Sequence, residues 1–186
     1  MEQLPSSADY IEETIAEFRR YRQLAERALA QIDDEAFGAV DAGTGDAIAT
    51  YVKHVGGNLR SRWTDFLTSD GEKPDRHRDN EFVLTPDDTR SALMERWAAG
   101  WDALFGAFEH LVADDLGRIV TIRREPHTVL RAAQRSLAHV AYHTGQIVLL
   151  AKRAAGSNWK TLSIPRGGSD AFARELEQRL QEEGRG

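Results

Sequence analysis

The sequence predicts an all-α protein, a four-helix bundle with long connections and a short C-terminal helix. Four long stretches carry apolar residues at the three- and four-residue spacing of an amphipathic helix. The segments between them are rich in glycine, proline and charged residues, which favour loops. The chain has 186 residues, the length of one domain with a substantial core. We therefore expect residues 1–186 to form a single helical-bundle domain.

The composition argues against several classes of protein. The formal net charge is -6 and no dense block of lysine or arginine occurs, which argues against a nucleic-acid-binding face. The chain has no cysteine, so it forms neither a disulfide nor a thiolate metal site, and this fits a cytoplasmic location. The N-terminus is acidic and amphipathic, which is not typical of a signal peptide. The longest apolar runs, such as Ile147–Ala151, are far too short to span a bilayer, so we expect no membrane partner.

The first helix is predicted over residues 7–32, where apolar side chains form one stripe and charged side chains cover the other side. The apolar positions are Tyr10, Ile11, Ile15, Phe18, Tyr21, Leu24, Ala25, Ala28 and Leu29. Residues 33–45 contain an acidic pair and three glycines, which predict a loop. They lack the regularly spaced oxygen ligands of a calcium loop.

The second helix is predicted over residues 46–67. Its apolar stripe consists of Ile48, Val52, Val55, Leu59, Trp63 and Phe66. His54 lies at the edge of this stripe. The pair Gly56–Gly57 costs about 1 kcal/mol per glycine relative to alanine. Either another helix or a ligand approaches closely there, or the pair simply weakens the helix.

The next segment, residues 69–84, is polar and without periodicity, as in functional or crossover connections. His77 lies among its charges and is expected to be exposed. Thr85-Pro86-Asp87-Asp88 predicts the start of the third helix, with threonine as the N-cap and proline at the first helical position. The bulky stripe that follows is expected to be core. It consists of Leu93, Trp97, Trp101, Leu104, Phe105 and Phe108.

Residues 113–126 are predicted to be a structured loop, because the alternating Val120 and Ile122 have no obvious partner strand. The fourth helix is predicted from an N-cap at Thr128 to about Ala155. Its outer side is also apolar, which predicts a neighbouring helix or subunit. The outer residues are Ala138, Ala141, Tyr142 and Leu149. A short final helix is predicted from Ser169 to about Gln181.

The fourth helix carries two histidines, His139 and His143, four residues apart. At that spacing both imidazoles leave the same face, one turn apart, and both lie within the apolar stripe. They are therefore able to offer two nitrogen ligands to one ion, although core histidines held by hydrogen bonds have the same pattern. The segment is not a zincin motif, because Val140 stands where that motif needs glutamate.

Three regions together resemble the DinB/YfiT-like superfamily in order and spacing. They are Lys53-His54-Val-Gly-Gly-Asn58-Leu-Arg60-Ser-Arg62-Trp63, His139-x-x-x-His143-x-Gly-Gln146-Ile, and Trp159-Lys-Thr-Leu-Ser-Ile-Pro-Arg166-Gly. The first and the third resemble a branch of this superfamily that is known only as a domain of unknown function. The resemblance covers nearly the whole chain.

The resemblance implies a four-helix bundle with at least one long crossover connection, often as a homodimer. It also implies one divalent metal ion, nickel or zinc, on three histidines, which here are His54, His139 and His143. Characterised relatives in the superfamily include enzymes that use a low-molecular-weight thiol for transfer or isomerisation. Because this chain has no cysteine, any such thiol comes from outside the protein.

These observations lead to three hypotheses. In the first, the protein is a metal-dependent transferase or hydrolase whose ion activates a low-molecular-weight thiol or water toward a small-molecule substrate. In the second, it is a non-catalytic metal-binding dimeric bundle, a sensor or interaction module. In the third, the histidines are hydrogen-bonded and bind no metal.

Three further side chains are candidate site residues. Gln146 lies one turn beyond His143 and Asn58 one turn beyond His54, so either is placed to orient a ligand. Arg62 is placed to hold an anionic group of a substrate. Structural hydrogen bonding is the alternative for each. No aspartate or glutamate lies within one turn of the three histidines, so the sequence offers no obvious general base.

Overall fold

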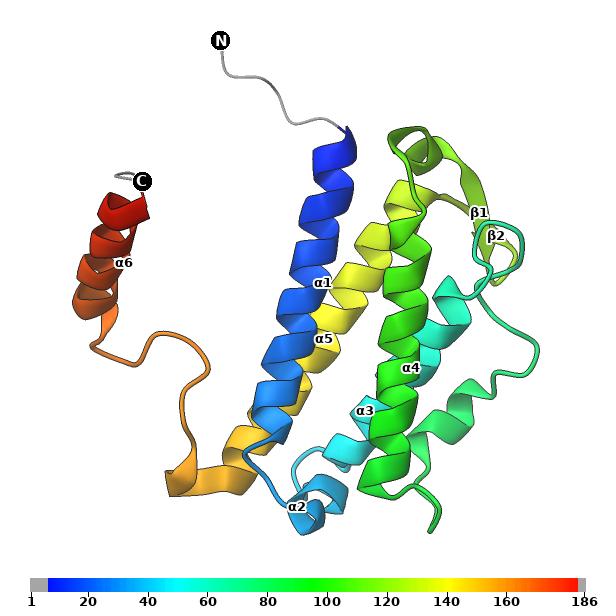
Figure 1. Ribbon diagram of the computed structural model, residues 1–186. Coiled ribbons are helices and arrows are strands. Elements are labelled where there is room, and N and C mark those ends of the chain that lie inside the picture. The colour runs from blue at the N-terminus through cyan, green and yellow to red at the C-terminus, as the bar shows by residue number, and fades with distance from the viewer. Residues whose placement is uncertain (1–6, 184–186) are drawn as a thin grey trace.

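The computed structural model describes residues 7–183, and Figure 1 shows four long helices packed side by side with one small hairpin at one end. This confirms the predicted all-α fold. The long helices are α1 (Ser7–Leu29), α3 (Ile48–Trp63), α4 (Arg90–Glu109) and α5 (Val129–Ala155). The short elements are α2 (Asp34–Gly38), η1 (Arg78–Phe82), η2 (Ala113–Gly117), β1 (Ile119–Ile122), β2 (Glu125–Thr128), η3 (Gly156–Asn158) and α6 (Ser169–Glu183).

The bundle contains one long crossover. Helices α1 and α5 run in one direction and α3 and α4 in the other (Figure 1). The closest helix pairs are α3 with α4 and α1 with α5. Because α3 and α4 follow each other in the chain and yet are parallel, residues 64–89 must travel the length of the bundle between them. This crossover contains η1 and covers one side of α3.

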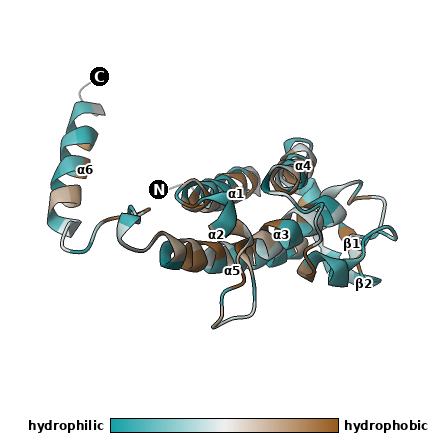
Figure 2. Cartoon of the chain, turned by 90° about the horizontal axis from the view of Figure 1, so that it is seen from below, coloured by the Kyte–Doolittle hydropathy of each residue, from teal (hydrophilic) through white to brown (hydrophobic). Residues whose placement is uncertain are grey.

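Aromatic side chains fill the centre of the bundle. Phe18 of α1 makes edge-to-face contacts with Trp101 and Phe108 of α4, at ring-centroid distances of 6.3 and 5.7 Å. Trp97 packs against Trp101 at 5.5 Å. The predicted stripe of the third helix is therefore core, except that Phe105 is half-buried. Figure 2, in which the ribbon is coloured by hydropathy, shows hydrophobic and hydrophilic residues alternating along these helices.

Two glycines allow α3 and α4 to cross at very short range. A Cβ on Gly56 would lie 2.9 Å from the carbonyl oxygen of Arg96, and one on Gly100 would lie 2.5 Å from the carbonyl oxygen of Gly56. Both distances are too short for a side chain, so the backbones touch only because these positions are glycine. The close approach of another helix is thus one of the two explanations that the sequence left open for Gly56, and it is the correct one.

The predicted start of the third helix at Thr85 is wrong. Helix α4 begins at Arg90, and its N-cap is Thr89, whose hydroxyl accepts a hydrogen bond from the backbone N–H of Ala92. The Asp88 carboxylate instead accepts hydrogen bonds from the backbone N–H and the hydroxyl of Thr85, which closes a separate turn before the helix. Asp88 also pairs with Lys53 of α3 and Arg96 of α4, so tertiary contacts draw it away from the helix start.

The other helix boundaries differ from the predictions by a few residues. Helix α3 is shorter at both ends than the predicted 46–67, and soon after its last residue Asp65 adopts a left-handed conformation with φ of 47°. The predicted loop 33–45 contains one helical turn, α2, whose N-cap is Asp33. The Thr128 N-cap of α5 and the end of that helix at Ala155 are as predicted.

Residues 119–128 form a hairpin, so the prediction of a structured loop without a partner strand is wrong. Strands β1 and β2 pair antiparallel, from Ile119 with Thr128 to Ile122 with Glu125. The two turn residues, Arg123 and Arg124, have φ of 55° and 65°, which is rare outside glycine and asparagine. The partner strand contains a proline and the turn contains two arginines, so the usual hairpin signals are absent from the sequence.

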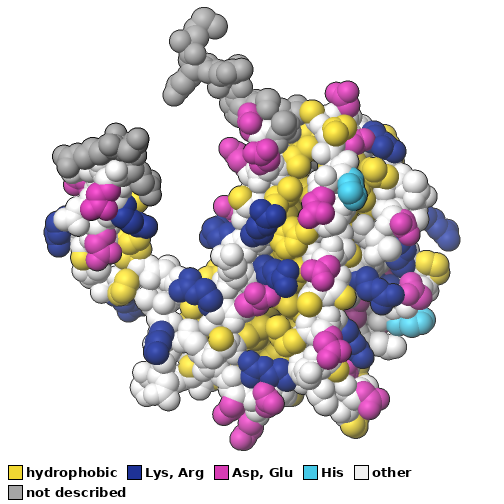
Figure 3. Space-filling view, in the orientation of Figure 1, with side chains coloured by type: hydrophobic (Ala, Val, Ile, Leu, Met, Phe, Trp, Pro, Cys, Tyr) yellow, Lys and Arg dark blue, Asp and Glu magenta, His cyan; other side chains and the backbone are white. Residues whose placement is uncertain are grey.

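Helix α6 stands away from the four long helices in both views (Figures 1 and 2). It begins at Ser169 as predicted and ends at Glu183. On the face drawn in Figure 3, acidic and basic side chains are interspersed and form no patch of one sign. Within residues 7–183, no helix combines the length and the apolar character needed to cross a membrane.

Candidate metal centre

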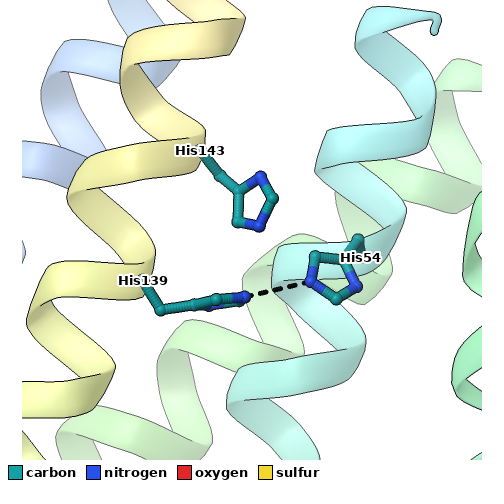
Figure 4. Close-up of side chains that lie close together, drawn as sticks. All are labelled: His54, His139 and His143. Carbon is teal, nitrogen blue, oxygen red and sulfur yellow. Dashed lines mark hydrogen bonds between the residues drawn. The ribbon is translucent and has the colours of Figure 1, made fainter.

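Three imidazoles from two helices meet inside the bundle. His54 comes from α3, and His139 and His143 come from successive turns of α5, so that the three rings face one another (Figure 4). Each ring offers one nitrogen to a group in which all three nitrogens lie within 4.8 Å of one another. The Nε2 atoms of His54 and His139 are 3.0 Å apart. The structure thus brings together the three residues that the resemblance implied.

His54 is held by a buried carboxylate. Its Nδ1 lies 2.7 Å from Oε2 of Glu81 in η1. Because an ionised carboxylate only accepts hydrogen bonds, Nδ1 carries a proton, and Nε2 faces the other two histidines. Gly57 makes room for this contact, since a Cβ there would collide with Oε1 of Glu81. Gly57 therefore leaves room for Glu81 beside His54, whereas its neighbour Gly56 allows the close crossing of α3 and α4.

Glu81 is in turn fixed by Arg76. The guanidinium donates from Nε to Oε1 and from Nη2 to Oε2 of Glu81, both at 2.8 Å, which is a bidentate pair. Burial by itself would raise the pKa of Glu81, but the hydrogen bonds from Arg76 and His54 outweigh it and lower the pKa below its usual value. Glu81 is therefore ionised at neutral pH and acts as an acceptor toward His54.

Glu81 is not among the site residues that the sequence predicts. It lies 27 residues from His54 in the crossover, in a segment that shows no periodicity. No local pattern marks it, because the contact exists only once the crossover has folded back against α3. Both oxygens of its carboxylate are engaged by Arg76 and His54, so it orients His54 and is not free to act as a general base.

His143 is oriented by a chain of polar groups. Its Nδ1 lies 2.7 Å from Oε1 of Gln146, whose Nε2 donates to the Tyr51 hydroxyl at 3.1 Å. The Tyr51 hydroxyl donates to Asp46 at 2.7 Å. Since the amide nitrogen of Gln146 is committed to Tyr51, its oxygen accepts from Nδ1–H of His143. The lone pair of His143 Nε2 is therefore free.

The imidazoles of α5 are neutral at physiological pH. Burial and the neighbouring rings of His143 and His54 lower the pKa of His139 to about 3. Burial and His54 lower the pKa of His143 to about 4, against the opposing hydrogen bond from Gln146. Neutral imidazole is the form that ligates a metal.

His139 differs from the other two histidines in its second nitrogen. Among the described residues, its Nδ1 is buried without a hydrogen-bond partner. Its Nε2 faces Nε2 of His54 at 3.0 Å. Either His139 donates a proton across this gap, or both lone pairs point at a shared ion.

The donor set suits a transition metal. Three imidazole nitrogen ligands favour zinc, nickel, copper or iron over magnesium or calcium, which prefer oxygen ligands. Two nitrogens bound to one tetrahedral ion at about 2.0 Å lie roughly 3.3 Å apart. The 3.0 Å between His54 and His139 Nε2 is close to that separation. The residues present therefore fit such an ion.

The three histidines line a cavity of about 520 Å³. The other three candidate side chains, Asn58, Arg62 and Gln146, lie on the same lining. Nη1 of Arg62 donates to Glu72 at 2.8 Å and to the carbonyl oxygen of Gly71, so structural hydrogen bonding occupies part of this group. Asn58 is buried one turn beyond His54.

Comparison with known families matches residues 5–168 to the family described as "Protein of unknown function (DUF1572)". The match covers most of the chain, including the three histidines and Glu81. Comparison with the curated proteins and with the solved structures finds no match.

Proposed function

The chain belongs to the DUF1572 family of proteins of unknown function, and we propose that it is a metal-dependent enzyme of the DinB/YfiT-like type. In this proposal a divalent ion, nickel or zinc, is held by His54, His139 and His143. The enzyme activates either a low-molecular-weight thiol, which is transferred to a small-molecule substrate, or a water, which hydrolyses that substrate. The observation that carries the proposal is that three imidazoles meet on the wall of a 520 Å³ cavity.

The chain's own residues prepare the ligands. Glu81 holds a proton of His54 on Nδ1 and Gln146 holds that of His143 on Nδ1, so both Nε2 atoms point inward. An ion held by these three residues would lower the pKa of a water or thiol that binds to it from the cavity. The chain contains no cysteine, so a reacting thiol must enter the cavity from solution.

The proposal also covers the domain organisation, the location, the assembly and the partners of the protein. Residues 1–186 are taken as one domain, located in the cytoplasm and assembled as a homodimer. No nucleic acid and no membrane is a partner. Arg62 and Asn58 are proposed to contact the substrate on the cavity lining.

A second candidate function is a non-catalytic metal-binding dimer. It is favoured by the outer face of α5, where Tyr142 is 65% and Leu149 is 56% exposed, as expected for a surface that another subunit covers. In that case the ion would regulate or stabilise an interaction.

Elemental analysis of protein purified without a histidine tag tests the metal. We expect about one ion per chain, lost in His139→Ala and retained in His77→Ala, because His77 is exposed and lies outside the site. Protein that contains no ion, and takes up neither nickel nor zinc on incubation, would exclude both candidate functions.

A second experiment separates catalysis from binding. Metal-loaded protein is incubated with cellular thiols and a test electrophile such as 1-chloro-2,4-dinitrobenzene, and we expect turnover that His139→Ala abolishes. Metal binding without turnover, together with mutants that alter self-association and no rate, would favour the second candidate.

A further inference from the structure

The cavity beside the three histidines is lined by guanidinium groups although the whole chain is acidic. Asp46 is the one acidic residue among the described residues of the lining, and it accepts a hydrogen bond from Tyr51. Five arginines lie on the same lining, in a chain of net charge -6. They are Arg62, Arg76, Arg78, Arg123 and Arg135.

Most of these arginines have carboxylate partners. Arg76 is committed to Glu81. Arg62 and Arg123 share one carboxylate, Glu72, at 2.8 and 3.1 Å. Arg78 pairs at 3.2 Å with an aspartate that is almost fully exposed, and such surface pairs contribute little.

Arg135 is the exception. Within residues 7–183 it forms no ion pair, and its Nη1 donates instead to Nε2 of His127 in β2 at 2.9 Å. Burial and the adjacent arginine lower the pKa of His127, so the imidazole is neutral and accepts the hydrogen bond without offsetting the charge. Arg135 is exposed on the cavity wall, and Oε2 of Glu125 lies 3.8 Å from the same His127 nitrogen without pairing with Arg135 within the ion-pair distance. The guanidinium therefore keeps donors for a ligand.

The place of Arg135 relative to the histidines is set by α5. It precedes His139 by four residues, so it lies on the same face of the helix, about 6 Å further along the axis. Hydrophobic side chains line the cavity at this end of the bundle, where α3 ends and the hairpin begins. They are Trp63, Phe66, Val120 and Ile122.

We infer that the Arg135 end of this cavity binds the carboxylate of a small organic substrate whose apolar part packs against Trp63 and the hairpin. The fork of Arg135 suits a planar carboxylate, and one helical turn separates this group from His139. A carboxylate of this kind would be the substrate class of the proposed enzyme. Only its role as a substrate rests on the proposed function. Binding of the carboxylate does not require the ion.

The test uses the full chain without metal. Protein dialysed against EDTA is titrated by calorimetry with phenylacetate, 3-phenylpropionate and 4-phenylbutyrate, and with the three corresponding amides. We expect at least one carboxylate to bind roughly tenfold or more tightly than its amide, because a charge-assisted hydrogen bond is lost in the amide. Arg135→Gln is expected to remove this preference.

A matched control lies on the same helix. Arg131→Gln makes the same substitution one turn earlier, at an exposed position off the cavity lining, and is expected to keep the preference. No binding by any of the three carboxylates, equal binding of acids and amides, or equal losses in both variants would overturn the inference.

In the last arm of the experiment, the same titrations are repeated with metal-loaded protein. Carboxylate binding that appears only with metal and ignores Arg135→Gln also overturns the inference, because the carboxylate then ligates the ion. That result leaves the proposed function standing. Conversely, Arg135-dependent binding in a protein that takes up no metal supports the inference and excludes the proposed function.

Discussion

The three histidines differ in how their second nitrogen is held. His54 donates to the buried carboxylate of Glu81, His143 donates to the amide of Gln146, and His139 has no such partner among the described residues. The Nε2 atoms of His54 and His143 are therefore aimed in advance, whereas the one polar contact of the His139 ring among the described residues is that of its Nε2 with Nε2 of His54 at 3.0 Å. Hydrogen bonds of this kind fix the tautomer of a ligand and increase its basicity.

At this scale we predict that Glu81→Gln weakens nickel or zinc binding by about 10- to 100-fold. The neutral amide loses the charge that strengthens the hydrogen bond to His54, and the Arg76 ion pair is lost with it. Metal affinity is measured by competition with a chromogenic chelator.

Two further variants make this prediction specific. Gly57→Ala leaves every charge in place but pushes on Glu81, so it should weaken metal binding in the same direction. Asp79→Asn changes an exposed carboxylate in the same 3-10 helix and should leave the affinity unchanged. An affinity for Glu81→Gln within twofold of the parent would show that the carboxylate does not act on the metal ligands.

At the scale of elements, the crossing of α3 and α4 depends on two glycines. We predict that Gly100→Ala destabilises the protein by roughly 1–3 kcal/mol, because the new methyl group would meet the backbone of Gly56 at 2.5 Å. Gly106→Ala, on the same helix, meets nothing within 4 Å and should stabilise by roughly 0.5–1 kcal/mol through helix propensity. Urea unfolding measures both, and effects of the same sign would contradict the close crossing.

One carboxylate of the crossover holds the turn of the hairpin. Asp70 accepts hydrogen bonds from the backbone N–H groups of Glu72, Arg123 and Arg124 at 2.7, 2.8 and 2.8 Å, and so supports the left-handed turn. Burial by itself would raise the pKa of Asp70, but these N–H groups outweigh it and hold the pKa at about 2.

We therefore predict that Asp70→Ala costs roughly 1–3 kcal/mol at pH 6. A folded pKa below the unfolded value of about 4 means that this contribution is full above pH 4 and is lost as the pH falls toward 2. The difference in unfolding free energy between parent and variant, from urea titrations, should thus shrink between pH 5 and pH 3. Asp87→Ala, an exposed position, should show no difference, and a pH-independent effect of Asp70→Ala would refute this account.

At the scale of the whole molecule, two apolar surfaces are left uncovered by the elements within residues 7–183. One is the outer face of α5, with Leu149 56% exposed, and the other is a stripe on α6, with Leu180 59% exposed. If the α5 face forms the homodimer interface, Leu149→Glu should convert the dimer to a monomer, whereas Leu180→Glu should not.

The oligomeric state of the parent and of both variants is measured by light scattering at micromolar concentration. Leu149 lies off the lining of the metal-centre cavity, so the variant should keep its metal. A parent protein that is monomeric at this concentration would exclude the dimer, and dissociation by Leu180→Glu alone would assign the interface to α6.

Much of the fold and part of the site could be predicted because helical spacing is a local property. Apolar residues at positions three and four apart placed the four long helices, and the same spacing put His139 and His143 on one face of α5. The Thr128 N-cap could be predicted for the same reason, because it binds a backbone N–H three residues away. The start of α4 could not be predicted in this way, because Asp88 pairs with Lys53 and Arg96 on two different helices.

By itself, then, the sequence determined the helices, their buried faces and the histidine pair on α5, all of which follow from residues close together in the chain. The tertiary structure decided which distant groups meet. The path of the crossover brings Glu81 to His54 across 27 residues, and the fold of the hairpin brings Arg123 and Arg124 to Asp70 across more than 50. Such contacts leave no periodic trace, because they depend on how the chain returns to the bundle and not on the spacing of neighbours.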